Sequence, residues 1–314
     1  MTLRILKPGL QTTIQDTGRP GNLYWGLSSG GAADTFAMAL GNRLLGNPDG
    51  HPCLEVTLTG PEIEFGEDLS VAITGAHFAL FHNDRAIAND EVIQMYRGDT
   101  LRFGALRSGA RAYIALAGEI DITATLGSRS THVVAGIGGM QGRPLQAGDQ
   151  IPLRSCRSAP PRRLPPQYRL DYRARPLLRV VPGLEQHYFS TTAHEQFYGG
   201  GFTVSPQSNR MGIRLAGESL PVENIPQQIS SALCPGTVQV PPNGQPIISF
   251  VEGQTIGGYP RIAHVISADL HRLGQLAPGS RLDFESVDID TAHRILRDKS
   301  RLLTELSEFT DEVE

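Results

Sequence analysis

The sequence is almost free of lysine, since Lys7 and Lys299 are the only two among 314 residues. This scarcity argues against Schiff-base chemistry and against lysine clamps for phosphate. A bound anion would have to meet arginine, backbone N–H groups or a helix end. The phosphate loop G-x-x-x-x-G-K-[ST] is missing as well, which excludes an ATP site of that type within this chain.

Cysteine is also scarce, and Cys53, Cys156 and Cys234 lie far apart. They predict neither a disulfide framework nor a CxxC metal site. The nine histidines show no ligand spacing, so we expect no metal. Cys234 precedes Pro235-Gly236 and could act as a nucleophile, but a small buried thiol is the commoner use of such a residue.

Long apolar runs are absent, and none approaches the roughly 20 residues of a membrane helix. Met1–Leu10 lacks the apolar region of a signal peptide and is typical of a first strand. The net charge of −4 and pI of about 6.1 give no electrostatic footprint for nucleic acid. We therefore expect a cytoplasmic protein that binds neither membrane nor nucleic acid.

What the chain has in abundance is glycine and proline, 35 and 22 residues respectively. They indicate many tight turns and short elements, hence a mainly β protein. In residues 1–154 we predict one helix, Ala33–Leu45, capped by Asp34 and ended at Gly46-Asn47-Pro48. Asn83-Asp84 is a plausible hairpin turn. The predicted strands here are Leu54–Leu58, Ser70–Thr74, Phe78–Phe81, Thr100–Phe103 and Ala112–Ala117.

Residues 155–176 contain too many prolines for a helix or sheet interior and predict an extended linker. Residues 177–314 then form a second β-rich half. We predict a helix near Glu185–Phe197 and an amphipathic terminal helix from about Asp290, whose apolar stripe includes Leu302, Leu306 and Phe309.

Three segments in the two halves share a pattern of a glycine turn, a short polar residue and an alternating strand. They start at Gly98, Gly148 and Gly279. The simpler interpretation is that turns commonly enter strands in this way. The alternative is two related barrels, one in each half.

Segments rich in amides and turn residues carry the chemical information. Gln239, Gln245 and Gln254 each offer both a donor and an acceptor, which suits a small cyclic amide or a urea-like substrate. Arg210 could pair bidentately with a carboxylate or phosphate. The alternative is that these residues satisfy the backbone of their own turns.

Several ordered stretches resemble one known family, that of allophanate hydrolase subunit 2, also called the biotin-dependent carboxyltransferase family, whose bacterial member is the C component of 5-oxoprolinase. The resemblance covers nearly the whole chain. Its most specific parts are Ser208–Gly212 and Gln254–Pro260. The others are Leu10–Asp16, Gly31–Asp34, Leu45–Pro48, Leu54–Leu58, Ala72–Ala76 and Leu126–Thr131.

The resemblance implies two cyclophilin-like β-barrel halves and a hetero-oligomer with subunits A and B that opens 5-oxoproline to glutamate with ATP. Relatives fused into urea carboxylase move a carboxyl group from biotin to urea. This chain departs from the family pattern at Gly30 and at Glu252–Ile256, which leaves the substrate open. Neither lysine lies in a biotin-attachment context, so any biotin would be carried by another protein.

On this basis we predict a site in which Gln239, Asn243 and Gln254 orient the lactam and Arg210 meets a carboxylate or phosphate. Glu252 or Asp16 would supply the catalytic carboxylate. The ATP site would be shared with partner chains. Further substrate-binding residues are predicted at Ser208, Asn209, Gln245, Thr255, Gly257, Gly258 and Tyr259.

Two other functions compete with this hypothesis. One is a carboxyltransferase component that uses biotin on another chain and acts on urea or a similar amide. The other is a regulatory binding protein that antagonises an inhibitor of a histidine kinase, as relatives of this family do in some bacteria.

Overall fold

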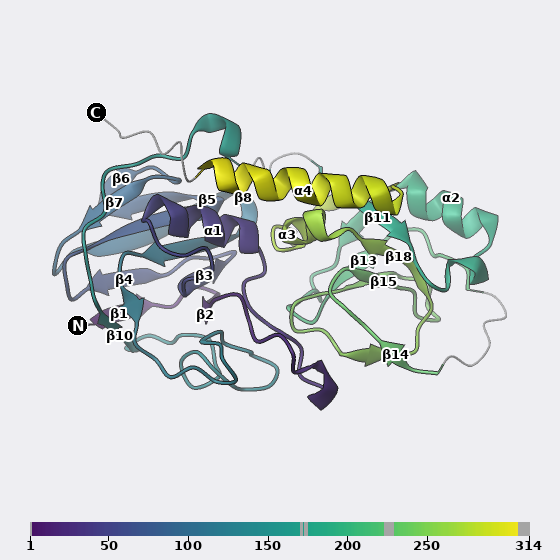
Figure 1. The fold of residues 1–314 in the computed structure, drawn as a ribbon, viewed down its shortest axis with the longest axis horizontal. Helices are drawn as coiled ribbons and strands as arrows, with labels where there is room; N and C mark the ends of the chain where they lie inside the picture. The colour runs from purple at the N-terminus through teal and green to yellow at the C-terminus, as the bar shows by residue number, and fades with distance from the viewer. Residues whose placement is uncertain (1, 170–171, 173–174, 223–228, 307–314) are drawn as a thin grey trace. The chain divides into compact units, whose positions relative to one another are not determined.

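A computed structural model describes residues 2–169, 172, 175–222 and 229–306. The chain divides into two compact units. Unit 1 comprises Met1–Arg19, Gly30–Arg173 and Leu302–Glu314, and unit 2 comprises Pro20–Ser29 and Ala174–Arg301. The described part is mostly strand, as Figure 1 shows, so the predicted mainly β fold is confirmed.

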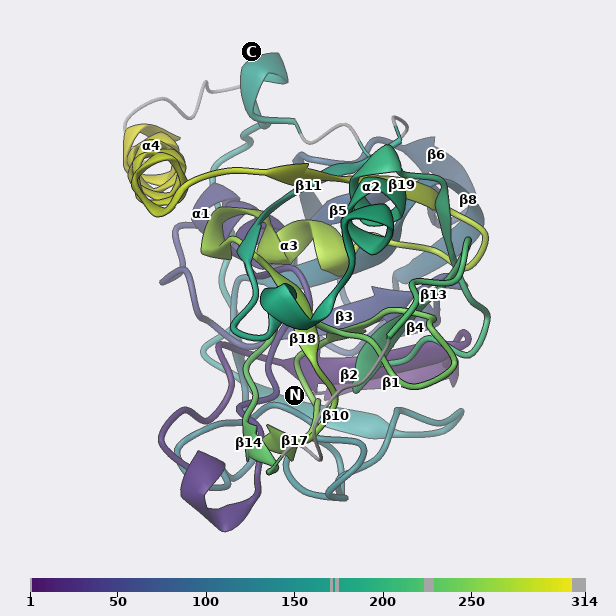
Figure 2. The same cartoon turned by 90° about the vertical axis from the view of Figure 1, so that its right-hand side faces the viewer.

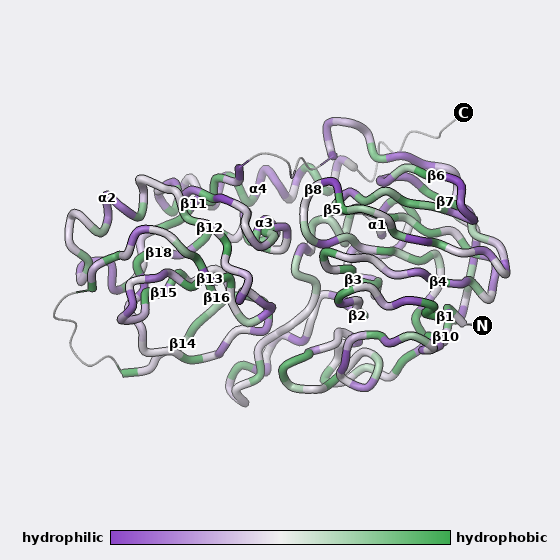
Figure 3. Tube along the Cα trace, turned by 180° about the vertical axis from the view of Figure 1, so that it is seen from behind, coloured by the Kyte–Doolittle hydropathy of each residue, from purple (hydrophilic) through white to green (hydrophobic). Residues whose placement is uncertain are grey.

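Unit 1 is built on a 10-stranded sheet. The path β2-β3-β8-β4-β1-β10-β9 is antiparallel throughout, and β5 joins β8 and carries β6 and β7. Figure 3 shows both hydrophobic and hydrophilic stretches along its strands. Buried and more exposed residues alternate along β1, β4 and β10, because successive side chains point to opposite faces. The strands are β1 (Thr2–Lys7), β2 (Gln11–Gln15), β3 (Cys53–Thr57), β4 (Glu62–Phe65), β5 (Leu69–His82), β6 (Arg85–Ile87), β7 (Val92–Met95), β8 (Thr100–Leu116), β9 (Glu119–Ile120) and β10 (Gln150–Arg154).

Strands β5 and β8 are longer than the sequence suggested. Each joins two predicted strands into one, so the predicted breaks within Leu69–His82 and Thr100–Leu116 are wrong. The cause is a series of register shifts between Gly75 and Leu80. These β-bulges interrupt the apolar alternation without ending the pairing. The hairpin turn at Asn83-Asp84 is confirmed, since both residues have positive φ, 45° and 65°, as a type I′ turn requires.

Helix α1 (Thr35–Leu44) agrees with prediction, and Asp34 caps it by accepting a hydrogen bond from the N–H of Ala37 at 2.8 Å. Its apolar face packs on β5 and β8, where Phe36, Leu40 and Leu44 meet Ala72 and Ala115. The proline-rich segment after β10 is extended, as the prolines require, and binds along unit 1. There Arg157 donates its backbone N–H to Ala117, and Leu164 is buried. A 3₁₀ turn, η2 (Pro166–Tyr168), follows.

Unit 2 contains a closed barrel in the strand order β11-β18-β15-β16-β13-β12-β19. Its pairs are antiparallel except β11 with β19, which is parallel. A short pair, β14 with β17, stands apart from it. The strands are β11 (Leu177–Pro182), β12 (Phe202–Val204), β13 (Gly212–Ala216), β14 (Ser231–Ala232), β15 (Thr237–Gln239), β16 (Ile247–Ser249), β17 (Ile256–Gly257), β18 (Arg261–Val265) and β19 (Arg281–Ser286).

The helix predicted near Glu185–Phe197 is displaced. A 3₁₀ turn, η3 (Gln186–Tyr188), comes first, and α2 (Thr191–Gly199) begins only after Ser190, whose hydroxyl accepts from the N–H of Ala193. The Ser190 cap thus sets the start of the helix, which the apolar spacing alone placed too early. Helix α2 lies beside β19 (Figure 2), where Phe197 stacks on Phe284 with ring centroids 4.3 Å apart.

The remaining helical segments are η1 (Leu23–Trp25), η4 (Ser267–Asp269), α3 (Leu270–Leu273) and α4 (Ile289–Leu306). The predicted terminal helix is thus confirmed over α4, while Phe309 lies outside the described residues. Leu302 remains 45% exposed. In the portion of the chain that the structure describes, no helix combines the length and apolar character needed to cross a membrane.

Asp269, at the junction of η4 and α3, is fully buried and makes unit 2 sensitive to acid. Arg179 donates to it from its backbone N–H at 3.0 Å and its Nε at 2.8 Å, and Arg272 lies 3.4 Å away. Burial alone would raise the pKa of Asp269, but the hydrogen bonds from Arg179 and the charges of Arg179 and Arg272 together lower it.

A carboxylate with a lowered pKa stabilises the fold at pH values above its unfolded value, about 3.9. That contribution disappears as the pH falls through the lowered folded pKa. Urea unfolding measured from pH 7 to pH 3 should therefore show a gap in stability between the wild type and Asp269→Asn that begins to narrow below about pH 4. A gap of constant size over the whole range would contradict this role for the charge.

Candidate functional site

A cavity of about 880 Å³ opens on unit 2 over three neighbouring barrel strands. In β13, β16 and β15, Arg214 is paired with Ile247, and Ile247 is paired with Gln239. Directly opposed residues of paired strands share a face, so the sheet itself aligns these three side chains. Ser249 lies opposite Gly212, which has no side chain to fill the space. The segments at 205–212, 239–246 and 254–259 supply the rest of the wall.

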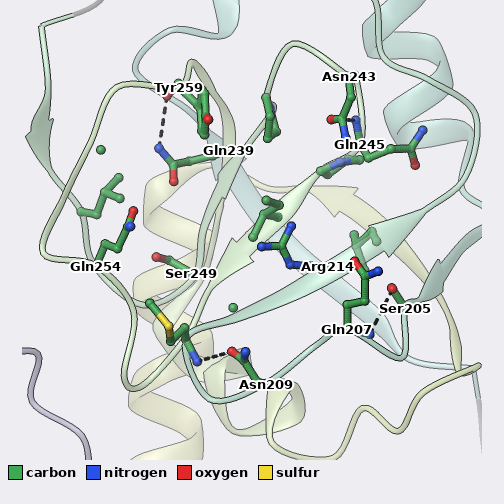
Figure 4. A pocket seen from close by; sticks show the side chains of 18 of the residues that line it. Ser205, Gln207, Asn209, Arg214, Gln239, Asn243, Gln245, Ser249, Gln254 and Tyr259 are labelled. Carbon is green, nitrogen blue, oxygen red and sulfur yellow. Dashed lines mark hydrogen bonds between the residues drawn. The ribbon is translucent and has the colours of Figure 1, made fainter. Parts of the chain in front are cut away.

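Among the described residues that line the cavity, one has a cationic side chain, Arg214. Figure 4 shows its guanidinium in the middle of the labelled side chains. Ile213 and Leu215 are buried on the opposite side of β13, whereas Arg214 is exposed. Hydrogen bonds with Ser208 hold its backbone. Its guanidinium has neither a hydrogen bond nor an ion pair with any residue that the structure describes, which leaves its five N–H donors for a ligand.

Three of the predicted amides have groups available to a ligand. Gln239 donates from Nε2 to the carbonyl of Tyr259 at 3.3 Å, which fixes the side chain and leaves its amide oxygen as an acceptor. Asn243 accepts from the N–H of Gln245 at 3.1 Å, which leaves its Nδ2 as a donor. The Gln254 amide has no partner within the described ranges. The pocket therefore presents both amide donors and amide acceptors.

The side chains of other predicted residues form hydrogen bonds with the protein's own backbone. The Gln245 amide exchanges two hydrogen bonds with the backbone of Gly217, at 3.0 and 3.3 Å. Asn209 accepts from the N–H of Met211 at 2.8 Å. Both line the cavity, but their side chains are partly occupied. Ser208 and Thr255 are not part of the lining.

The glycines at 257 and 258 contribute backbone but no side chains to one wall of the cavity. A methyl group on Gly257 would come within 2.6 Å of a Leu233 methyl and 2.8 Å of Gln239 Nε2. The absence of a side chain thus lets β17 close over Gln239. Tyr259 follows them in the lining and is half exposed.

Arg210 and Glu252, two of the three predicted catalytic residues, are brought together but not into the cavity. They form an ion pair of 2.5 Å in which both side chains are almost completely buried. Two backbone hydrogen bonds, Glu252 to Arg210 at 2.8 Å and Phe250 to Met211 at 3.0 Å, join the same two loops. The pair therefore ties together two segments that form the wall.

Asp16, the third predicted catalytic residue, lies in unit 1 and is buried. Its carboxylate accepts hydrogen bonds from the N–H groups of Gly18 and Arg129 and from the hydroxyls of Ser128 and Ser130. Those donors occupy its oxygens and hold the loop at 125–131 to the end of β2.

The chemistry of the lining suits binding and orientation better than proton transfer. Among the residues that the structure describes, the lining includes no aspartate, glutamate, histidine or lysine, and these residues offer no general base of the usual kinds. Within the described ranges, no three His, Cys, Asp or Glu side chains gather as a metal site. The described part of the lining, with one arginine and no carboxylate to hold Mg²⁺, does not fit the triphosphate of ATP.

Arg214 is the main functional residue that the sequence reasoning missed. The signal for it was the alternation of Gly212–Ala216, in which an arginine stands between two apolar residues directly after the polar segment at 205–211. Ser249, which also lies in the lining, was missed because a single serine within the apolar stretch 247–251 gives no distinguishing signal.

Comparison with known proteins gives consistent matches. Residues 25–286 match the family model described as the carboxyltransferase domain, subdomain A and B. The chain is 37% identical over 306 residues to the C component of 5-oxoprolinase from Escherichia coli (strain K12), covering 97% of each protein. It is 31% identical to urea amidolyase of Saccharomyces cerevisiae, over 93% of this chain and 17% of that protein. The solved structure of the K. lactis urea amidolyase matches with a TM-score of 0.90 at 28% identity, over all of this chain and 20% of that one.

Proposed function

Because this chain belongs to the carboxyltransferase domain family with subdomains A and B, we propose that it is the component of an ATP-dependent 5-oxoprolinase that binds the lactam. Subunits A and B would complete the enzyme, and hydrolysis would convert 5-oxo-L-proline to L-glutamate. The near full-length similarity to the C components of two bacterial 5-oxoprolinases supports this assignment.

The observation that carries the proposal is the Arg214 guanidinium, which lies among neutral amides and has no partner among the described residues. 5-Oxoproline has one carboxylate, one ring N–H and one ring C=O. Arg214 would pair with the carboxylate. The oxygen of Gln239 would accept from the ring N–H, and Gln254 or Asn243 would donate to the ring C=O.

In this arrangement the chain fixes the lactam and leaves the rest of the chemistry to its partners. Opening the ring requires water to add to the carbonyl carbon and the ring C–N bond to break, with a proton delivered to nitrogen. The lining residues that the structure describes have no carboxylate or imidazole for these proton transfers. The volume of about 880 Å³ is within the range of ligand sites and larger than one small lactam needs. We therefore expect partner residues to enter it and supply the base and the nucleotide site.

The test compares 5-oxo-L-proline with 2-pyrrolidinone, the same ring without the carboxylate, by calorimetric titration of the chain and of the complex with subunits A and B. A hydrogen-bonded charge pair contributes about 1.5–3 kcal/mol, so the acid should bind about 10-fold to 150-fold more tightly. Only the complete complex should release glutamate with ATP. Equal affinities, or no glutamate from the complete complex, would contradict the proposal.

A second candidate is carboxyl transfer to an amide, which the similarity to urea amidolyases favours. Biotin carried on another chain would then deliver the carboxyl group. Urea is neutral and has no carboxylate for Arg214, so this function predicts that urea binds and that 5-oxo-L-proline gains nothing over 2-pyrrolidinone. The same titration separates the two candidates.

A further inference from the structure

Next to the cavity, but outside its lining, lies a cluster of three reactive side chains, Cys234, Thr237 and His264. We infer that Cys234 is a reactive thiol, held beside His264, which low-molecular-weight disulfides and other soft electrophiles modify. The sequence suggested a small buried thiol at this position. Cys234 is instead exposed. The inference does not depend on which substrate the cavity binds.

A tight turn creates the cluster. Cys234-Pro235-Gly236-Thr237 closes with a hydrogen bond of 3.2 Å from the N–H of Thr237 to the carbonyl of Cys234, and Gly236 has φ of 94°. Proline followed by a glycine of positive φ is the pattern of a type II turn. The turn folds the sulfur back over the first residue of β15, and Thr237 lies directly opposite His264 of β18. The sulfur is 3.7 Å from Thr237 Oγ1 and 4.0 Å from His264 Nδ1.

The hydrogen bonds assign the proton on the imidazole. Thr237 Oγ1 has one hydrogen, and it donates this to the carbonyl of Cys234 at 2.9 Å. The contact of 3.3 Å between Thr237 Oγ1 and His264 Nδ1 then requires Nδ1 to be the donor. An N–H at Nδ1 also faces the sulfur, where it stabilises the thiolate in preference to the thiol.

The charges around the sulfur favour the same form. His264 and Arg261 project from β18, and Arg261 is paired with Glu185, which lies between β11 and η3. The hydrogen bond from His264 lowers the pKa of Cys234 against the opposing effect of partial burial, and the charge of Arg261 adds to the lowering. The other two cysteines differ, since burial raises the pKa of both Cys53 and Cys156. One thiol of the three is therefore activated.

The reaction is thiol–disulfide exchange. The Cys234 thiolate attacks one sulfur of the small disulfide, a new S–S bond forms, and the original S–S bond breaks. Cys234 is oxidised, and the departing thiolate, which is the reduced product, takes a proton from solvent. With an alkylating agent such as iodoacetamide, the same thiolate forms an S–C bond and iodide leaves.

The test uses the full chain and follows each cysteine by mass spectrometry during reaction with iodoacetamide and with glutathione disulfide. An ordinary thiol is only a few per cent ionised at pH 7, so Cys234 should react at least about 10-fold faster than Cys156 at that pH. Its rate should level off at a lower pH than that of an unfolded control peptide spanning residues 230–240. Glutathione disulfide should give a mixed disulfide at Cys234.

A histidine variant identifies the cause of the activation. His264→Asn should slow alkylation of Cys234 about 5-fold or more at pH 7 and move its pH profile upward. His293→Asn, at an exposed position of α4, should leave both unchanged. Similar rates for Cys234 and Cys156 in the wild type, a measurement that needs no variant, would overturn the inference. So would a folded His264→Asn protein with the wild-type pH profile.

Discussion

Replacing Arg210 by alanine should destabilise unit 2 by about 3–5 kcal/mol, the cost of leaving one charge of a buried pair without its partner. Glu252 is completely buried, and Arg210 Nε approaches it to 2.5 Å. Without the guanidinium, the buried carboxylate must either remain charged without its ion-pair partner or take up a proton. The two loops that the pair joins would separate, and the cavity wall at 205–212 would move with them.

The measurement is hydrogen exchange by mass spectrometry, because peptides within 177–301 report on unit 2 without averaging over the whole chain. Arg281→Ala, at an exposed position of β19, is the matched control and should change stability by no more than about 0.5 kcal/mol. The double variant Arg210→Met with Glu252→Met removes both charges and should recover most of the loss. A single variant as stable as Arg281→Ala would show that the pair does not hold these loops together.

The same ion pair shows why the sequence could not assign the site completely. Arg210 and Glu252 are 42 residues apart, and both lie in polar segments of the kind that surround ligands. Nothing in the sequence distinguishes an arginine that binds a substrate from one that forms an ion pair with a glutamate of another loop. The same holds for the Gln245 amide, which the backbone of Gly217 occupies. The sequence could therefore predict that the amide-rich segments form the site, but the role of each side chain depends on its partners in the tertiary structure.

The fold was predictable where local signals are strong. The Asp34 cap and the Gly46 stop define α1, and Asn83-Asp84 defines a hairpin. Prediction failed where tertiary structure overrides the local pattern. The bulges in β5 interrupt the apolar alternation, so the sequence pattern predicted two strands where the structure has one. The sequence also contains no signal that β11 and β19 pair in parallel to close the barrel.

A substitution of Arg214 is the most direct mutational test of the proposed lactam site. In Arg214→Gln, the affinity for 5-oxo-L-proline should fall about 10-fold to 150-fold, the equivalent of a lost charge-assisted pair of about 1.5–3 kcal/mol. Affinity for 2-pyrrolidinone should stay within about twofold, because that ring has no carboxylate for the guanidinium to contact. The two affinities should therefore converge, and calorimetric titration of both ligands against both proteins measures the convergence.

Stability should hardly change in Arg214→Gln, because the guanidinium has no partner within the described chain that the substitution would strand. This separates it from Arg210→Ala, in which any loss of binding would follow from a loss of structure. Arg281→Gln is the matched control for charge, since it removes one positive charge from the same unit outside the cavity. If both glutamine variants weakened 5-oxo-L-proline equally, the effect would be one of net charge, and the carboxylate would have to be held elsewhere. If only Arg214→Gln weakens binding of 5-oxo-L-proline, then Arg214, at the centre of β13, is the residue that binds the carboxylate of the ligand.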